Sequence, residues 1–111
     1  MSKFPIIVCD DDKDLANQMA KNINASIQDL TDDNNGYAEL EESVTFVAND
    51  FAQAVGYVVA NDIKNGIYFL DIELSRESKA KKGVDLAEFI KKNDENAQII
   101  FVTAYDKYAP L

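Results

Sequence analysis

The sequence predicts an α/β protein, built on an open parallel β-sheet with helices on both of its faces. Short apolar runs alternate with amphipathic segments along the whole chain, and the runs are rich in β-branched and aromatic residues. This alternation implies parallel strands joined by right-handed helical crossovers. Ligands of such sheets bind at the carboxyl ends of the strands, so we expect functional residues at that edge.

Four apolar runs are predicted to form the strands. Residues 6–9 make a continuous apolar run, which is typical of a strand buried on both faces. The other three predicted strands cover residues 44–47, 67–70 and 99–102. The first and third runs end at aspartates and the fourth ends at Thr103, so each of the three delivers a polar group to the same edge.

The first predicted helix follows the first strand. Asp12 or Asp14 is expected to cap it, and a polar, acidic loop is expected over residues 31–42. Apolar residues recur every four positions and define one buried stripe. The residues of this stripe are Leu15, Met19, Ile23 and Ile27.

Two further helices are predicted between the later strands. Asn49 or Asp50 is expected to cap the second, and the third is expected over residues 84–92. Each helix has an apolar face that should turn toward the sheet. These inward residues are Phe51, Val55, Val58 and Val59 in the second helix, and Leu86, Phe89 and Ile90 in the third.

The amino-acid composition excludes several classes of function. The 111 residues fit one domain, with 47% hydrophobic and 28% charged residues. The formal net charge of -9 excludes the chain itself as a nucleic-acid binder and favours cations or basic surfaces as ligands. The absence of histidine excludes histidine-based catalysis and histidine-ligated metals, and the single cysteine, Cys9, excludes an internal disulfide. No apolar run approaches a membrane span and no signal peptide is evident, so we expect a soluble cytoplasmic protein.

Carboxylates gather at the ends of the predicted strands. Asp10 and Asp11 follow the first strand, and Asp71 follows the third. If these strands are neighbours, the carboxylates converge and repel one another unless they are protonated, solvated or bridged by a cation. Oxygen ligands favour a hard cation, and Mg²⁺ fits best. The alternative is that these aspartates only cap helices and shape turns.

Four sequence motifs resemble those of response-regulator receiver domains. They are Ile-Ile-Val-Cys-Asp-Asp-Asp at 6–12, Tyr-Phe-Leu-Asp-Ile-Glu-Leu at 68–74, Gly-Val-Asp-Leu-Ala at 83–87 and Ile-Ile-Phe-Val-Thr-Ala at 99–104. The resemblance implies a flavodoxin-like (CheY-like) fold over residues 1–111. The sequences of the third and fourth predicted strands are most similar to those of LytTR-type regulators, which control quorum sensing and bacteriocin production through a DNA-binding domain.

The resemblance implies a role for each matched residue. Asp71 would accept a phosphoryl group from a sensor histidine kinase. Mg²⁺ would be held by Asp10, Asp11, Asp71 and the backbone carbonyl of Glu73. Thr103 would bind a phosphoryl oxygen, while the small side chain of Ala104 would leave room for the donor. The chain would act as a switch in a two-component system and not as a turnover enzyme.

The sequence departs from the receiver pattern at its C-terminal end. The fifth strand, the fifth helix and the lysine that pairs with the phosphoryl group have no counterpart, so we expect an incomplete receiver domain whose fourth-strand edge could self-associate. Two other functions stay open. One is a Mg²⁺-dependent phosphatase of the haloacid-dehalogenase type, although Asp71-Ile72-Glu73 has a glutamate where that class has a second aspartate. The other is a pseudo-receiver, an interaction module that is never phosphorylated.

Overall fold

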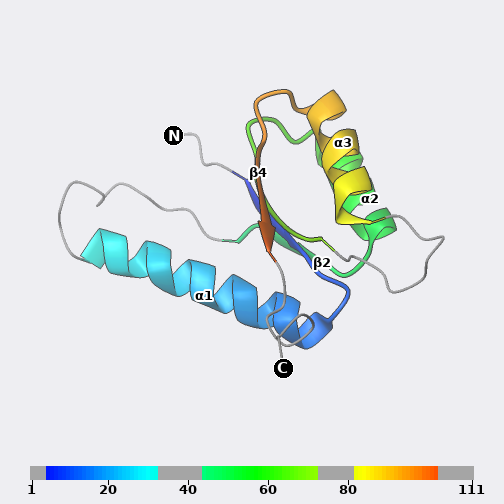
Figure 1. The fold of residues 1–111 in the computed structure, drawn as a ribbon. Coiled ribbons are helices and arrows are strands. Elements are labelled where there is room, and N and C mark those ends of the chain that lie inside the picture. The colour runs from blue at the N-terminus through cyan, green and yellow to red at the C-terminus, as the bar shows by residue number, and fades with distance from the viewer. Residues whose placement is uncertain (1–4, 33–43, 73–81, 103–111) are drawn as a thin grey trace.

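The computed structural model describes residues 5–32, 44–72 and 82–102 of the chain. Strands and helices alternate without exception in this part (Figure 1). The elements are β1 (Ile6–Cys9), α1 (Lys13–Asp32), β2 (Phe46–Ala48), α2 (Phe51–Asn61), β3 (Ile67–Asp71), α3 (Gly83–Asn93) and β4 (Gln98–Val102).

The four strands form one parallel sheet in the order β2-β1-β3-β4. Strands β2 and β4 each pair with the strand before them in sequence, whereas β3 pairs with β1 and not with β2. Because all three pairs are parallel, each connection needs the helical crossover that the sequence predicts. Strand β3 pairs with β1 and with β4 along its length, and Leu70 is the register partner of both Cys9 and Phe101. This arrangement confirms the predicted α/β class with an open parallel sheet.

Helix α1 covers one face of the sheet, and α2 and α3 lie together on the other (Figure 1). The apolar core is concentrated between the sheet and the α2–α3 pair. Burial of each of its large aliphatic side chains contributes about 1.5–3 kcal/mol, so this layer makes a large contribution to the stability of the fold. Its fully buried members include Ile7, Cys9, Ala54, Val58, Tyr68, Leu70, Leu86 and Ile90.

Two predicted boundaries were wrong by a few residues. The second strand covers Phe46–Ala48 and not residues 44–47. Thr45 still bonds to β1, because its hydroxyl accepts a hydrogen bond from the Ile6 amide at 3.1 Å, but it precedes the regular ladder. Helix α1 extends to Asp32, past the predicted start of the loop at residue 31.

One predicted core residue of α2 was also wrong. Val59 is 60% exposed, whereas Val58 and Ala54 are buried against the sheet. Residues four apart lie on the same side of a helix, and the next residue is rotated by about 100°. The pair Ala54–Val58 therefore defines the inner face, and Val59 points away from it.

Side-chain caps begin the first two helices, as predicted. A carboxylate oxygen of Asp12 accepts hydrogen bonds from the amides of Asp14 at 3.0 Å and Leu15 at 3.1 Å. Asp50 accepts one from the amide of Gln53 at 2.7 Å. Each bond satisfies an amide that has no partner within the helix. Of the alternatives that the sequence left open, Asp12 and Asp50 are the caps.

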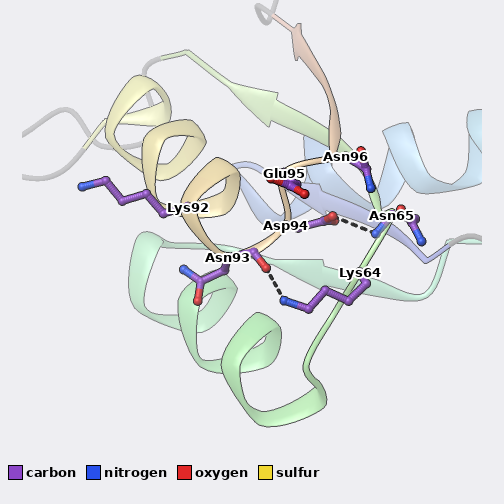
Figure 2. Close-up of a pocket in the computed structure, with 7 residues that line it drawn as sticks. All are labelled: Lys64, Asn65, Lys92, Asn93, Asp94, Glu95 and Asn96. Atoms are coloured by element: carbon purple, nitrogen blue, oxygen red, sulfur yellow. Dashed lines mark hydrogen bonds between the residues drawn. The ribbon is translucent and has the colours of Figure 1, made fainter.

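A buried carboxylate ties together the two loops that precede β3 and β4 (Figure 2). Asp94 is 2% exposed, and its two oxygens accept hydrogen bonds from the amides of Asn65 and Gly66, each at 2.8 Å. Asn65 has a positive φ of 58°, which a turn asparagine tolerates better than most residues. Lys64 adds a bond from its ammonium group to the Asn93 carbonyl. This clamp sets the register at the amino ends of β3 and β4.

None of the helices in the described part of the chain is both long enough and apolar enough to cross a membrane.

Candidate functional site

Three carboxylates meet at the carboxyl ends of β1 and β3. Asp10 and Asp11 directly follow β1, and Asp71 is the last residue of β3. One oxygen from each of the three side chains lies within 4.8 Å of the others. Asp10 is 2% exposed and Asp71 is fully buried, while Asp11 is partly exposed. The predicted convergence is therefore confirmed, because β1 and β3 are neighbours in the sheet.

The backbone around Asp10 is held from two sides. The amide of Asp12 donates a 2.9 Å hydrogen bond to the Asp10 carboxylate, so the start of α1 orients this side chain. From the other side, the Asn49 side-chain amide donates a 3.1 Å bond to the Asp10 carbonyl. The amide of Asp10 donates to Ala48 at 3.1 Å, which extends the β1–β2 pairing into the site.

Asn49 is a positioning residue whose role the sequence does not predict, because its place after a strand indicates only a helix cap. Its backbone amide donates a 2.8 Å hydrogen bond to the side chain of Gln53, so α2 in turn fixes Asn49. The signal in the sequence is a polar residue directly after a strand, in the same place as Asp10 and Asp71 after theirs. Only the β1–β2 pairing tells which carbonyl this side chain reaches.

Helix α3 begins against the backbone of Asp71. The Gly83 amide donates a 3.1 Å hydrogen bond to the Ile72 carbonyl. A β-carbon on Gly83 would overlap the carbonyl oxygen of Asp71 and lie 3.0 Å from its carbonyl carbon and 3.1 Å from the α-carbon of Ile72. Because the neighbouring atoms are backbone, no side-chain rotation can make room. Glycine is thus required where the helix approaches the buried carboxylate.

Burial and the negative charges of the nearby aspartates both raise the pKa of the Cys9 thiol. It lies on the last residue of β1 and is fully buried. Burial is the main cause that raises its pKa to about 12, followed by the negative charges of Asp10, Asp50, Asp71 and Asp11. A thiolate is disfavoured here because it would add a charge to an already negative, poorly solvated region.

This shift predicts a loss of stability at alkaline pH. The folded pKa lies above the unfolded value of 9.0, so the contribution of Cys9 is intact below pH 9 and is lost progressively between pH 9 and about 12. Urea unfolding near pH 8 and near pH 10.5 should show the Cys9→Ala variant losing about 1–2 kcal/mol less than the unsubstituted protein across this interval. An equal loss in both proteins would contradict the shift.

The remaining predicted site residues lie outside the described part of the chain. These are Glu73, Thr103 and Ala104. The nearest described residue of β4 is Val102, which is the register partner of Asp71. Strand β4 therefore neighbours the strand that carries Asp71, as the predicted site requires.

The geometry permits a hard cation at the three carboxylates. A cation between Asp10, Asp11 and Asp71 would relieve their mutual repulsion and accept their oxygens as ligands. The chemistry of this set fits Mg²⁺, which binds a few carboxylates and completes its octahedron with other oxygens. The pocket of Figure 2, about 390 Å³, lies by contrast at the opposite edge of the sheet, beside Asp94.

Comparison with known proteins adds a structural neighbour. No protein-family model and no curated protein matches this sequence. Among solved structures, the chain is similar to PhyR, an anti-anti-sigma factor from Bartonella quintana, with a TM-score of 0.60 and 18% identity. The match covers 97% of this chain, which spans 36% of that protein. At this identity the similarity establishes the fold, which is receiver-like.

Proposed function

We propose that this chain is a phosphorylation-dependent switch of a two-component system, in which Asp71 accepts a phosphoryl group from a sensor histidine kinase. The observation that carries the proposal is the position of Asp71: it ends a central strand and shares the acidic cluster with Asp10 and Asp11. The receiver-like fold supports the same function.

The proposed reaction moves one phosphoryl group. A carboxylate oxygen of Asp71 attacks phosphorus and forms an acyl phosphate, while the P–N bond to the donor histidine breaks and its electron pair stays on the imidazole. Asp10, Asp11 and Asp71 would hold Mg²⁺, with the Glu73 carbonyl that the resemblance implies, and the bound ion would supply positive charge to the phosphoryl oxygens. As the resemblance implies, Thr103 would bind a phosphoryl oxygen in the product, and the small side chain of Ala104 would leave space for the donor.

The wider setting of the switch is part of the proposal. The parent protein is a cytoplasmic transcription regulator, and its DNA-binding output lies outside this chain. The LytTR type and a role in quorum sensing rest only on the wording of the motifs at 68–74 and 99–104. The structural neighbour, an anti-anti-sigma factor, lends no support to that subfamily.

Two alternatives differ in what they do with phosphate. A phosphatase of the haloacid-dehalogenase type would turn over phosphate esters, whereas a receiver is modified once and only slowly hydrolyses its own acyl phosphate. A pseudo-receiver would bind partners and never be modified. The order of the acidic residues favours the receiver, since the pair Asp10–Asp11 precedes Asp71 by two strands and two helices.

Intact-mass spectrometry after incubation with acetyl phosphate tests the proposal. With Mg²⁺ present, we expect a single phosphoryl adduct that disappears in Asp71→Asn and when the metal is chelated. Asp62→Asn is the matched control: its side chain is 86% exposed and its backbone is in the left-handed region, which asparagine tolerates. This control should be phosphorylated like the unsubstituted chain.

The other outcomes separate the alternatives. Multiple turnover of a phosphate ester would support the phosphatase and contradict the switch. Absence of any adduct, with Mg²⁺ binding detected by calorimetry, would leave the pseudo-receiver. An adduct that persists in Asp71→Asn would assign the phosphoryl group to another residue.

A further inference from the structure

The corner between β2 and α2 is bonded to the end of β1 at three places. The Asp10 amide donates a 3.1 Å hydrogen bond to the Ala48 carbonyl, which continues the strand pairing. The Asn49 side chain donates a 3.1 Å bond in return, to the Asp10 carbonyl. The buried Cys9 thiol donates to the Asp50 carbonyl, with a sulfur–oxygen distance of 3.7 Å. This corner therefore holds the backbone at which the acidic cluster begins.

The first turn of α2 fixes the corner in turn. The Asn49 backbone amide donates a 2.8 Å hydrogen bond to the side-chain oxygen of Gln53, and the Gln53 amide donates a 2.7 Å bond to the Asp50 carboxylate. This exchange resembles a capping box, in which a helix cap and the residue three positions later bond to each other's amides. Here the Gln53 side chain reaches the residue before the cap instead. A chain of hydrogen bonds thus runs from α2 through Asn49 to the backbone of Asp10.

The carbonyl that Asn49 holds lies between two residues of the acidic cluster. It belongs to the planar peptide group that joins Asp10 to Asp11. Fixing this plane restricts the backbone torsion angles on both sides of it, and so the directions in which both carboxylates point. The carboxylates of Asp10, Asp11 and Asp71 lie within 4.8 Å of one another, where their charges repel. Outside contacts are therefore needed to keep them converged.

We propose that Asn49 and Gln53 are positioning residues for the cation site, and that cation binding in turn tightens the first turn of α2. The inference rests on the proposed function, in which the acidic cluster holds Mg²⁺. Asn49 acts through the Asp10–Asp11 peptide, and Gln53 acts through Asn49. Groups that orient the ligands of a metal strongly affect its affinity. Because coupling between two sites is reciprocal, Mg²⁺ favours the bonded corner by the same factor as the corner favours Mg²⁺.

A role limited to capping α2 makes a different prediction. Asp50 is the cap of this helix, and the side-chain amide of Asn49 points to Asp10 and not to a helical amide. If these residues served only the stability of α2, their loss would lower the free energy of unfolding and leave the Mg²⁺ affinity of the folded chain unchanged. The Mg²⁺ affinity of folded variants therefore separates positioning from capping.

Calorimetric Mg²⁺ titration of the full 111-residue chain tests the positioning role, with folding of each variant checked by circular dichroism. Asn49→Ala should weaken Mg²⁺ binding by about three- to tenfold, and Gln53→Ala by a smaller factor. The double variant should bind like Asn49→Ala alone, because Gln53 acts through Asn49. Gln53→Glu keeps the acceptor oxygen and should bind like the unsubstituted chain. Asn61→Ala is the control: its side-chain amide also donates to a carbonyl, that of Tyr57, but at the last residue of α2.

Amide hydrogen exchange tests the reciprocal effect without any substitution. Saturating Mg²⁺ should raise the protection of the Asn49 and Gln53 amides by a factor similar to the affinity lost in Asn49→Ala. The Asn65 amide is the control and should not change, because its partner is Asp94, at the opposite edge of the sheet.

The outcomes distinguish this inference from the proposed function. Absence of Mg²⁺ binding by the unsubstituted chain overturns the cation site and the inference together. Mg²⁺ binding that is equally strong in Asn49→Ala overturns only the inference, and so does an equal loss in the Asn61→Ala control. Weak binding by Gln53→Glu overturns the role of the acceptor oxygen. Unchanged protection of the Asn49 and Gln53 amides overturns the coupling to α2.

Discussion

Replacing Gly83 with alanine is expected to destabilise the domain by about 2–3 kcal/mol and to weaken the proposed binding of Mg²⁺ at the acidic cluster. The added β-carbon would overlap the Asp71 carbonyl oxygen, so α3 or the end of β3 must move. Both responses disturb the backbone that carries the buried Asp71 carboxylate. Urea unfolding measures the first effect, and Mg²⁺ titration by calorimetry measures the second.

Gly56→Ala is the matched control for this prediction. Gly56 lies within α2, and a β-carbon there meets no atom within 4 Å. Alanine has the higher helix propensity, so this variant should be more stable by about 0.5–1 kcal/mol. The same substitution thus has opposite signs at two helical glycines. Equal effects at the two positions would show that the Gly83–Asp71 contact does not constrain the fold.

Removing the Asp94 carboxylate is expected to cost about 2–4 kcal/mol of stability, the second large effect. Asp94→Ala would leave the Asn65 amide and the buried Gly66 amide without their charged acceptor. It would also free the loops that set the register of β3 and β4. Thermal or urea unfolding, monitored by circular dichroism, gives the loss directly.

Two further variants separate the hydrogen bonds of Asp94 from its charge. Glu95→Ala removes an adjacent exposed acid and should change stability by less than about 0.5 kcal/mol. Asp94→Asn keeps one oxygen acceptor but turns an amino group toward the second amide, so its loss should lie between those of the other two variants. If Asp94→Ala were as stable as Glu95→Ala, the clamp would have no energetic role.

Much of the candidate site could be predicted because its parts are local. The apolar run before Asp10 and the apolar run ending at Asp71 each predict a strand. The carboxyl ends of parallel strands lie at the same edge of a sheet, so the two aspartates are expected to be close together. The hydrogen bond by which Asn49 positions the Asp10 backbone could not be predicted in this way. That residue reaches the Asp10 carbonyl across 39 positions of sequence, and only strand pairing brings the two together.

The alternation of strands and helices, and the sheet edge at which the acidic residues meet, can be predicted from the sequence, which also narrows each of the first two helix caps to two candidates. Those features depend on hydrophobic periodicity and on residues a few positions apart, both of which can be recognised in the sequence. Only the tertiary structure decided that Gly83 abuts Asp71, that Asp94 holds Gly66 and that Val59 faces outward. Each of these three features depends on how the crossover helices pack against the sheet. Contacts between segments that are distant in sequence follow from packing and strand register, and not from the local sequence pattern.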